Sequence, residues 1–294
     1  MAVNMASVAR GEDTAPEPKR TTVRRKRRRT WHIHIALSII CAISCAPVVY
    51  AILVSTQNNA QMINFDLTLG ESFFANLSTV WNDRNLGNYM INSAIMAVII
   101  AVGKSITGLL AGLAFVYFRF PGRWIVFFFV LITLMMPTEI SILALFEVTY
   151  DLGISGSMAG LTIPFLASAT AAFLFRQHFA NLPANLSEAA QLDGANPLQF
   201  LSRVLVPLSW NVLGALVVIE FLYGWNMYLW PLLTVSNRDN QVVQVGLATL
   251  QQSGEGQMYG PLMLGALIAS IPPILVFLAL QRPFMRGFAM TRDK

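Results

Sequence analysis

Long apolar runs alternate with short polar intervals along this chain, and six of the runs are long enough to cross a bilayer. A membrane-spanning helix needs about 20 mainly apolar residues. The predicted segments lie near Ile33–Ser55, Tyr89–Tyr117, Trp124–Val148, Ala159–Phe175, Leu208–Leu229 and Leu262–Leu280. The pattern therefore predicts an all-α, polytopic membrane protein, with six transmembrane helices in one domain over residues 31–294.

Composition agrees with this pattern and adds an orientation. Of the 294 residues, 55% are hydrophobic and 12% are charged, which leaves too little polar surface for a soluble domain. Basic residues such as Arg119, Arg123 and Arg176 follow even-numbered segments, whereas Asp83 and Asp151 lie in the other loops. Because cytoplasmic loops are rich in Lys and Arg, we expect both termini in the cytoplasm.

A basic tail precedes the first apolar segment. Residues 1–30 are polar, end in KRTTVRRKRRRT and lack apolar periodicity, so we expect a disordered cytoplasmic tail. A basic run directly before an apolar segment is typical of an orientation signal that touches anionic lipid. We prefer this interpretation to nucleic-acid binding and expect membrane lipid, but no nucleic acid, as a partner.

Residues 181–207 are a polar interval with the pattern of two short helices. Asn181 is suited to cap the first helix, and Gly194 is suited to end it in the left-handed conformation. Asn196 is a good cap for a second helix, which Pro197 would open at its first position. The stretch contains no nucleophile, metal cluster or phosphate loop, so we interpret it as a surface for docking another protein.

The same stretch carries a resemblance to a known family. The chain resembles the permease subunits of bacterial ATP-binding-cassette (ABC) importers, whose EAA loop is matched by Glu188, Ala189, Ala190, Asp193, Gly194, Ala195, Phe200 and Pro207. The resemblance runs from about Asn92 to Arg286 and includes FRFPGR, LMMPTEI, YGWNMYLWPLL and LQRPFMRGF, which are similar to the carbohydrate-uptake branch. Within that branch the chain looks most like the permeases of glycerol-3-phosphate importers.

The resemblance implies a fold, partners and a location. It implies the type I ABC importer permease fold in the bacterial cytoplasmic membrane, with the EAA loop (residues 181–207) seated in a groove of the ATPase. The implied partners are a second, homologous permease in a heterodimer, an ATPase dimer and an extracytoplasmic substrate-binding protein. The chain has no GxxxxGK[ST] motif, so ATP and Mg are expected on the ATPase subunits, with no cofactor and no catalytic residue here.

The implied function is import of a sugar or sugar phosphate by alternating access. Uptake of maltose or another oligosaccharide is the alternative cargo, and a stand-alone secondary transporter is a more distant alternative. A carrier that works alone needs no ATPase socket, so the EAA loop favours the importer. A membrane-embedded enzyme that uses Lys104, Glu139 and Glu220 as acid and base is a further, disfavoured alternative. A metal site is not expected for it, because His32, His34 and His178 lie too far apart to converge.

Three ionisable residues lie deep inside the predicted segments: Lys104, Glu139 and Glu220. A charge at the bilayer centre costs on the order of 3 kcal/mol, so each needs a partner or water. Lys104 and Glu139 are both about 20 Å from the cytoplasmic ends of their helices at ~1.5 Å per residue. We therefore predict an ion pair between them. Exposure of Lys104 to the path of an anionic cargo is the alternative.

Two loops and an aromatic stretch complete the prediction. In YGWNMYLWPLL, Trp225 and Asn226 stand between a Gly and a Pro, which favours a broken helix lining a cavity over a simple aromatic belt. In the loop at residues 56–86, Phe73, Phe74, Leu77 and Trp81 predict a small amphipathic helix, which either meets the binding protein or anchors the bundle. Residues 234–258 predict a flexible, glycine-rich loop.

Overall fold

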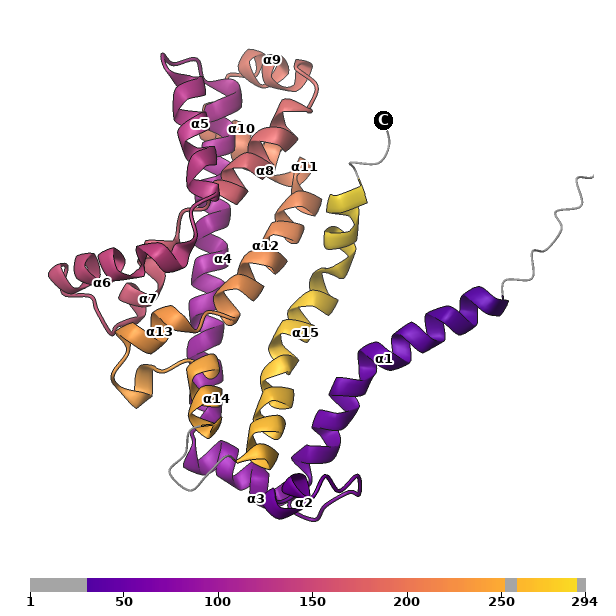
Figure 1. Ribbon diagram of the computed structural model, residues 1–294. Helices are drawn as coiled ribbons and strands as arrows, with labels where there is room; N and C mark the ends of the chain where they lie inside the picture. Colours follow the sequence, from indigo (N-terminus) through magenta and orange to yellow (C-terminus); the bar gives the residue numbers. More distant parts are fainter. Residues whose placement is uncertain (1–30, 252–257, 290–294) are drawn as a thin grey trace, which may run out of the picture. The chain divides into compact units, whose positions relative to one another are not determined.

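The chain is a set of α-helices joined by short turns (Figure 1). The computed structural model describes residues 31–251 and 258–289, and no strand occurs among them. The chain divides after Ala46 into two units, which are treated separately because their placement relative to one another is not determined. The predicted disordered tail and most of the QQSGEGQ stretch lie outside the described residues.

Three helices are long and apolar enough to cross a membrane by themselves. They are α1 (Trp31–Ser55), α4 (Leu86–Tyr117) and α15 (Tyr259–Ala289). Three further pairs of helices pass the same test together, each pair being bent at a short break. Counting each pair as one span gives six, and the prediction of an all-α membrane protein with six segments is confirmed.

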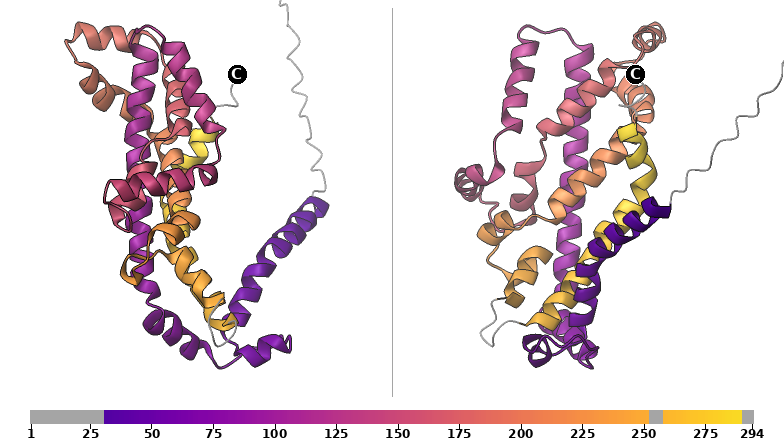
Figure 2. Two further views of the ribbon diagram at one scale, coloured as in Figure 1. Left: turned by 60° about the vertical axis from the view of Figure 1, so that its left-hand side comes forward. Right: turned by 45° about the vertical axis from the view of Figure 1, so that its right-hand side comes forward.

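The segment that we expected to be straight from Trp124 to Val148 is one of the broken ones. Its halves are α5 (Arg123–Leu134) and the 3-10 turn η2 (Thr138–Ser141) with α6 (Ile142–Asp151), and they meet at 90° (Figure 2). Pro137 lies at the break with an extended backbone. A proline has no N–H to donate and disfavours a helical residue before it, which explains the break.

The fourth segment is bent by 43° between α7 (Met158–Thr162) with η3 (Ile163–Phe165) and α8 (Ala169–Ala180). Ser168 begins α8, because its Oγ accepts a hydrogen bond from the N–H of Ala171. α8 packs along α4, and the approach is close at Gly108. A Cβ at that glycine would lie 2.5 Å from the Cβ of Ala171.

The fifth segment, α12 (Trp210–Trp225), packs against both α4 and α15. It follows α10 (Pro197–Phe200), the π-helical turn η4 (Leu201–Leu205) and α11 (Val206–Leu208) across an 84° bend. α12 stops at Trp225, and a new short helix, α13 (Leu229–Thr234), begins after three intervening residues. The predicted break in this helix is confirmed.

Short helices cover the end of the bundle away from the EAA loop (Figure 1). The predicted amphipathic helix is present as α3 (Phe73–Ser78) with the π-helical turn η1 (Thr79–Asp83), after α2 (Asn59–Ile63). Beyond α13 come η5 (Arg238–Asn240) and α14 (Val243–Gln251). We expected only a flexible loop there. α14 is ordered because Val243 and Leu250 are buried against the core around α4 and α15.

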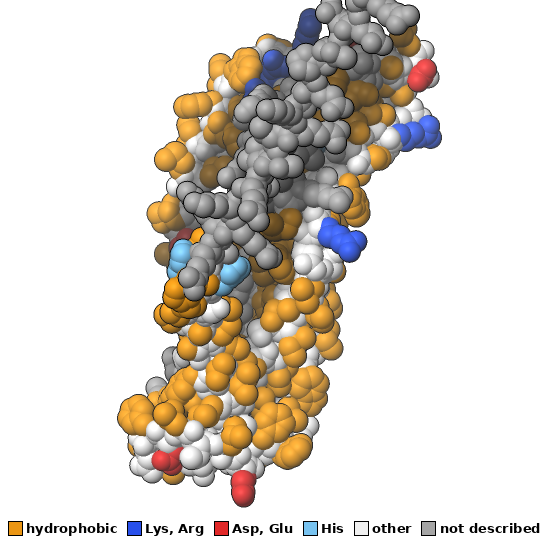
Figure 3. All heavy atoms as spheres, turned by 90° about the vertical axis from the view of Figure 1, so that its right-hand side faces the viewer, with side chains coloured by type: hydrophobic (Ala, Val, Ile, Leu, Met, Phe, Trp, Pro, Cys, Tyr) orange, Lys and Arg blue, Asp and Glu red, His pale blue; other side chains and the backbone are white. Residues whose placement is uncertain are grey.

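The surface is as apolar as a membrane protein requires. Hydrophobic side chains cover most of the described face in Figure 3, with few charged groups among them. Large side chains such as Val98, Ile106 and Phe128 are about half exposed or more. So many exposed apolar groups would aggregate in water, whereas hydrocarbon solvates them well.

Candidate functional site

The EAA loop is a compact pair of helices. Its first helix, α9 (Asn185–Leu192), ends before Gly194, whose φ of 73° is the left-handed conformation expected there. Asn196 caps α10 in a capping box: its Oδ1 accepts from the N–H of Gln199 at 2.8 Å, and Gln199 Oε1 accepts from the N–H of Asn196 at 3.0 Å. The two-helix prediction is confirmed for this segment.

The prediction for Asn181 is wrong. α8 continues to Ala180, and the side-chain amide of Asn181 donates to the carbonyl of Gln177 at 2.7 Å. Asn181 therefore follows the end of α8 and does not cap α9. α9 begins after Ala184 without a side-chain cap, because the apolar end of α8 extends one turn further than the sequence pattern suggested.

The inner side of the EAA loop is anchored in a hydrophobic cluster. Ala190 and Phe200 are buried, and Ala195 packs against the same cluster, which includes Leu205. The ring of Phe200 meets that of Tyr117, at the end of α4, edge to face at 5.0 Å. The loop is thus packed directly against the end of α4.

The outer side of the EAA loop faces away from the bundle. Exposed residues of the predicted coupling set are Glu188, Ala189, Asp193, Gly194 and Pro207. The structure adds two exposed leucines that the sequence pattern did not single out, Leu192 at 90% exposure and Leu198 at 64%. Glu188 and Leu192 are four residues apart on α9, so they share one face, and this spacing was a usable signal.

A buried ion pair joins two helices in the middle of the bundle. Lys104 Nζ on α4 lies 2.8 Å from Glu220 Oε2 on α12, and the two residues are 7% and 4% exposed. The ammonium also lies 3.7 Å from the centre of the Tyr223 ring. Each charge is therefore compensated where neither could be solvated by water.

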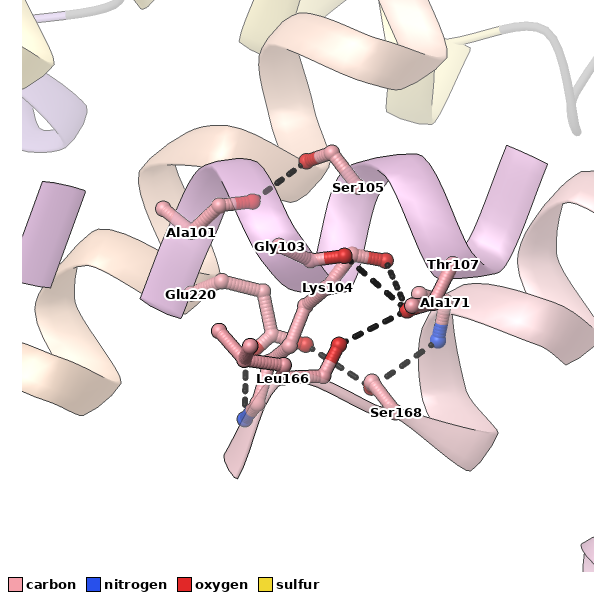
Figure 4. A network of polar contacts seen from close by, with 9 residues as sticks. All are labelled: Ala101, Gly103, Lys104, Ser105, Thr107, Leu166, Ser168, Ala171 and Glu220. Carbon is pink, nitrogen blue, oxygen red and sulfur yellow. Dashed lines mark hydrogen bonds and ion pairs between the residues drawn. The ribbon is translucent and has the colours of Figure 1, made fainter. Parts of the chain in front are cut away.

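The ion pair is part of a larger polar network that also holds α8 (Figure 4). Ser168 Oγ donates to the second carboxylate oxygen of Glu220 at 3.0 Å while it caps α8. Thr107 Oγ1 on α4 donates at 2.8 Å to the carbonyl of Leu166, just before α8. Backbone groups released by the bend in the fourth segment are thereby satisfied, as a nonpolar environment demands.

The predicted ion pair between Lys104 and Glu139 is wrong. The 90° break at Pro137 removes Glu139 from the helical position that the prediction assumed, and its side chain is exposed. Glu220 takes its place. Lys104 lies 13 residues before Tyr117, and Glu220 lies 13 residues after Pro207, so the depth argument applied equally well to this pair.

A cavity of about 530 Å³ lies beside the network. Its polar lining includes Glu139, Asn226, Tyr223 and Tyr228, and Trp230 belongs to the mainly apolar remainder of the wall. Tyr223 belongs to both the cavity and the ion pair, because its ring lies under the Lys104 ammonium. A mostly apolar hollow with a few polar groups is typical of a site for a small molecule.

Trp225, which was predicted to line the cavity, lies in a different environment from Tyr223. Trp225 is 2% exposed and stacks on Phe221 with ring centres 5.8 Å apart, inside the core. It also contributes to a smaller hollow of about 370 Å³ together with Asn226. Asn226 Oδ1 accepts a hydrogen bond from Gln244 at 3.3 Å, which ties the break after α12 to α14. Among the described residues, no group of His, Cys, Asp and Glu could hold a metal.

A bundle of apolar helices with broken segments, an open hollow and a projecting anchored loop is typical of a membrane transport protein. Residues 104–289 match the family described as the binding-protein-dependent transport system inner membrane component. This match covers more than half of the chain, so the chain belongs to that family.

Similar proteins agree with this assignment. The chain is 39% identical over 265 residues to the sn-glycerol-3-phosphate transport system permease protein UgpE of Pectobacterium atrosepticum, covering 87% of this chain and 94% of that protein. It is 40% identical over 263 residues to UgpE of Salmonella typhi, with 86% and 94% covered. The resemblance to importer permeases is confirmed.

A solved structure shares the fold. It is a bacterial ABC transporter involved in the import of the acidic polysaccharide alginate, with a TM-score of 0.74 at 24% identity. The similarity covers 86% of this chain and 95% of that one. The chain therefore has the fold of an ABC importer permease.

Proposed function

We propose that this chain is the permease subunit of an ABC importer that carries sn-glycerol-3-phosphate across the bacterial cytoplasmic membrane. The observation that carries the proposal is the identity of 39 to 40% with permeases of that transport system, over nearly the whole length of both chains.

The EAA loop is the proposed docking site for a separate ATPase subunit. Ala190 and Phe200 fix the loop to the bundle, while Leu192 and Leu198 are left in contact with water. Exposed leucines beside a carboxylate such as Glu188 favour a protein partner with an apolar groove and polar rim. ATP and Mg would be bound by that subunit, since this chain has no phosphate loop.

Helix α4 connects the EAA loop to the polar network and would pass a displacement of the loop to it. Phe200 contacts Tyr117 at one end of α4, and Lys104 stands on the same helix next to Glu220. A rigid helix carries a displacement of its end to its middle. We infer that closure of the ATPase dimer moves α4 against α12 and opens the cavity at Tyr223 to cargo in alternating access.

The remaining partners follow from the same proposal. The cavity lies on one chain only, and a second homologous permease would complete a path around it. An extracytoplasmic binding protein would select the cargo and dock at the end that carries α3. Both termini and the EAA loop would then be cytoplasmic.

The first test measures ATP hydrolysis by the purified complex of this permease with its ATPase and second permease. Binding protein loaded with glycerol-3-phosphate should stimulate hydrolysis, whereas binding protein exposed only to maltose should not. Stimulation by maltose alone would assign the chain to oligosaccharide uptake. Failure of the chain to co-purify with any ATPase subunit would contradict its assignment to an ABC importer.

The second test addresses the docking site. Leu192→Asp places a charge in the proposed interface and should release the ATPase during purification, because a buried unpaired charge is costly. Leu69→Asp is the matched control, since Leu69 is also exposed but lies in the loop at the opposite end. Equal retention of the ATPase by both variants would remove Leu192 from the interface.

A further inference from the structure

The FRFPGR stretch has no part in the proposed transport function, yet it forms a built feature of the fold. It is the turn between α4 and α5, on the same end of the bundle as the EAA loop (Figure 1). A hollow of about 470 Å³ opens there, lined by Arg119, Phe120, Arg123 and Trp124. Two cations and two aromatic rings thus surround one concave site at the end of an apolar helix.

A third arginine, on α8, contacts the same tryptophan from beside the hollow. The guanidinium of Arg176 lies 5.0 Å from the centre of the Trp124 ring and 4.7 Å from that of Phe127. The guanidinium of Arg123 lies 5.3 Å from the Trp124 ring. Two of the cations are therefore held by contact with one indole, within the range of a cation–π interaction.

None of these arginines is neutralised within the described part of the chain. The structure gives none of the three arginines an ion pair with a described carboxylate. Arg123 donates only to the carbonyl of Phe118 at 3.4 Å, and Arg176 donates to the side chain of Gln177 at 3.0 Å. The cluster keeps a strong local positive charge with guanidinium donors to spare.

The surroundings identify the class of anion. α5 continues from the cluster as an apolar helix, and Ile125, Phe128 and Phe129 are all well exposed on it. An anion that fits must place its charge at the arginines and a long apolar part along this helix. A phospholipid meets both conditions, because guanidinium binds phosphate in a fork and tryptophan favours the membrane interface.

We propose that Arg119, Arg123 and Arg176 form a binding site for the headgroup of an anionic phospholipid. The acyl chains lie along α5, and the phosphate joins the α4–α5 turn to α8. α8 leads directly into the EAA loop, so the bound lipid holds the base of that loop in place. The site is separate from the cargo path and does not depend on which cargo is carried.

The experiment uses the complete complex in nanodiscs containing phospholipids brominated in their acyl chains. Bromine quenches nearby indole fluorescence, and the contribution of Trp124 is the difference between the native protein and Trp124→Phe. Brominated phosphatidylglycerol should quench Trp124 more strongly than the same share of brominated phosphatidylcholine. Equal quenching by the two lipids in the native protein overturns the proposal.

Variants locate the binding groups. Arg119→Gln, at an exposed position, should lower the preference for phosphatidylglycerol roughly fivefold, and the additional changes Arg123→Gln and Arg176→Gln should abolish it. Arg238→Gln, on the opposite end, is the charge-matched control and should leave the preference unchanged. A preference for phosphatidylglycerol that survives the triple change overturns the proposal. If the triple variant does not fold, an unchanged preference in Arg119→Gln overturns it instead.

An additional arm separates lipid from free anion. Excess inorganic phosphate should leave the quenching by phosphatidylglycerol unchanged, because the acyl chains along α5 contribute to lipid binding. Displacement by inorganic phosphate would assign the cluster to a soluble anion and overturn the lipid site. Transport of glycerol-3-phosphate is measured separately, so a failure of the proposed function is distinguishable.

Discussion

The buried ion pair between Lys104 and Glu220 allows a quantitative prediction. Lys104→Met removes the cation and leaves the Glu220 carboxylate with the hydrogen bond from Ser168, at a residue that is 4% exposed. An uncompensated buried charge costs about 3 to 5 kcal/mol. At about 2 to 4 °C per kcal/mol, the melting temperature of the purified protein should fall on the order of 10 °C.

A second substitution tests which carboxylate is the partner. Lys104→Met combined with Glu220→Gln should recover most of the lost stability, because both charges are then gone and the amide can still bond to Ser168. Lys104→Met with Glu139→Gln is the matched control and should recover nothing, since Glu139 is exposed beside the cavity. Melting is followed by tryptophan fluorescence in one fixed detergent. Recovery with Glu139→Gln, or none with Glu220→Gln, would refute the assignment.

Three further predictions concern the EAA loop, helix packing and orientation. Gly194→Val forces a β-branched residue into the left-handed region at a cost of about 1 to 2 kcal/mol, so stimulated ATP hydrolysis should fall while the bundle remains folded; unchanged stimulation would contradict the coupling role. Gly108→Leu should lower the melting temperature, because a Cβ there would lie 2.5 Å from that of Ala171; the half-exposed Val98→Leu is the control and should melt normally. Cysteine at Ser78 should react with an impermeant maleimide from outside intact cells and cysteine at Ser187 should not, in a chain whose two native cysteines are replaced by serine; the reverse labelling would invert the topology.

Much of the fold was predictable because lipid imposes a simple rule on sequence. Apolar runs near 20 residues long located all six segments, and Gly194 and Asn196 located the turn within the EAA loop. The break after Trp225 was also predictable, since a polar Asn226 stands between Gly and Pro in an otherwise apolar run. Each of these features depends on a short stretch of sequence, so it could be predicted without the tertiary structure.

The predictions failed where the packing of distant segments determines which side chains meet. Length and hydropathy treat Trp124–Val148 as one straight helix, so they placed Glu139 level with Lys104. Pro137 was visible in the sequence, but the size of the bend was not, and the bend decides which carboxylate meets the lysine. The three-helix network with Ser168 was similarly missed, because a serine in an apolar run gives no indication of its partner across the bundle.

The two short helices of the EAA loop were predictable from sequence, but not all of the side chains on its outer face were. Glu188 and Asp193 were identified from the resemblance, whereas Leu192 and Leu198 were not, since an apolar residue in a polar helix is ordinarily assigned to the buried side. Their exposure follows from the orientation of α9 and α10 on the bundle, which depends on the burial of Ala190 and Phe200.

The most direct test of the central proposal is uptake of labelled glycerol-3-phosphate by proteoliposomes that hold the complete importer and its binding protein. The native complex should accumulate the cargo only when ATP is supplied on the side of the EAA loop. The double variant Leu192→Asp and Leu198→Asp should abolish accumulation, whereas Leu69→Asp should transport normally. Uptake without ATP, or full uptake by the double variant, would contradict the account.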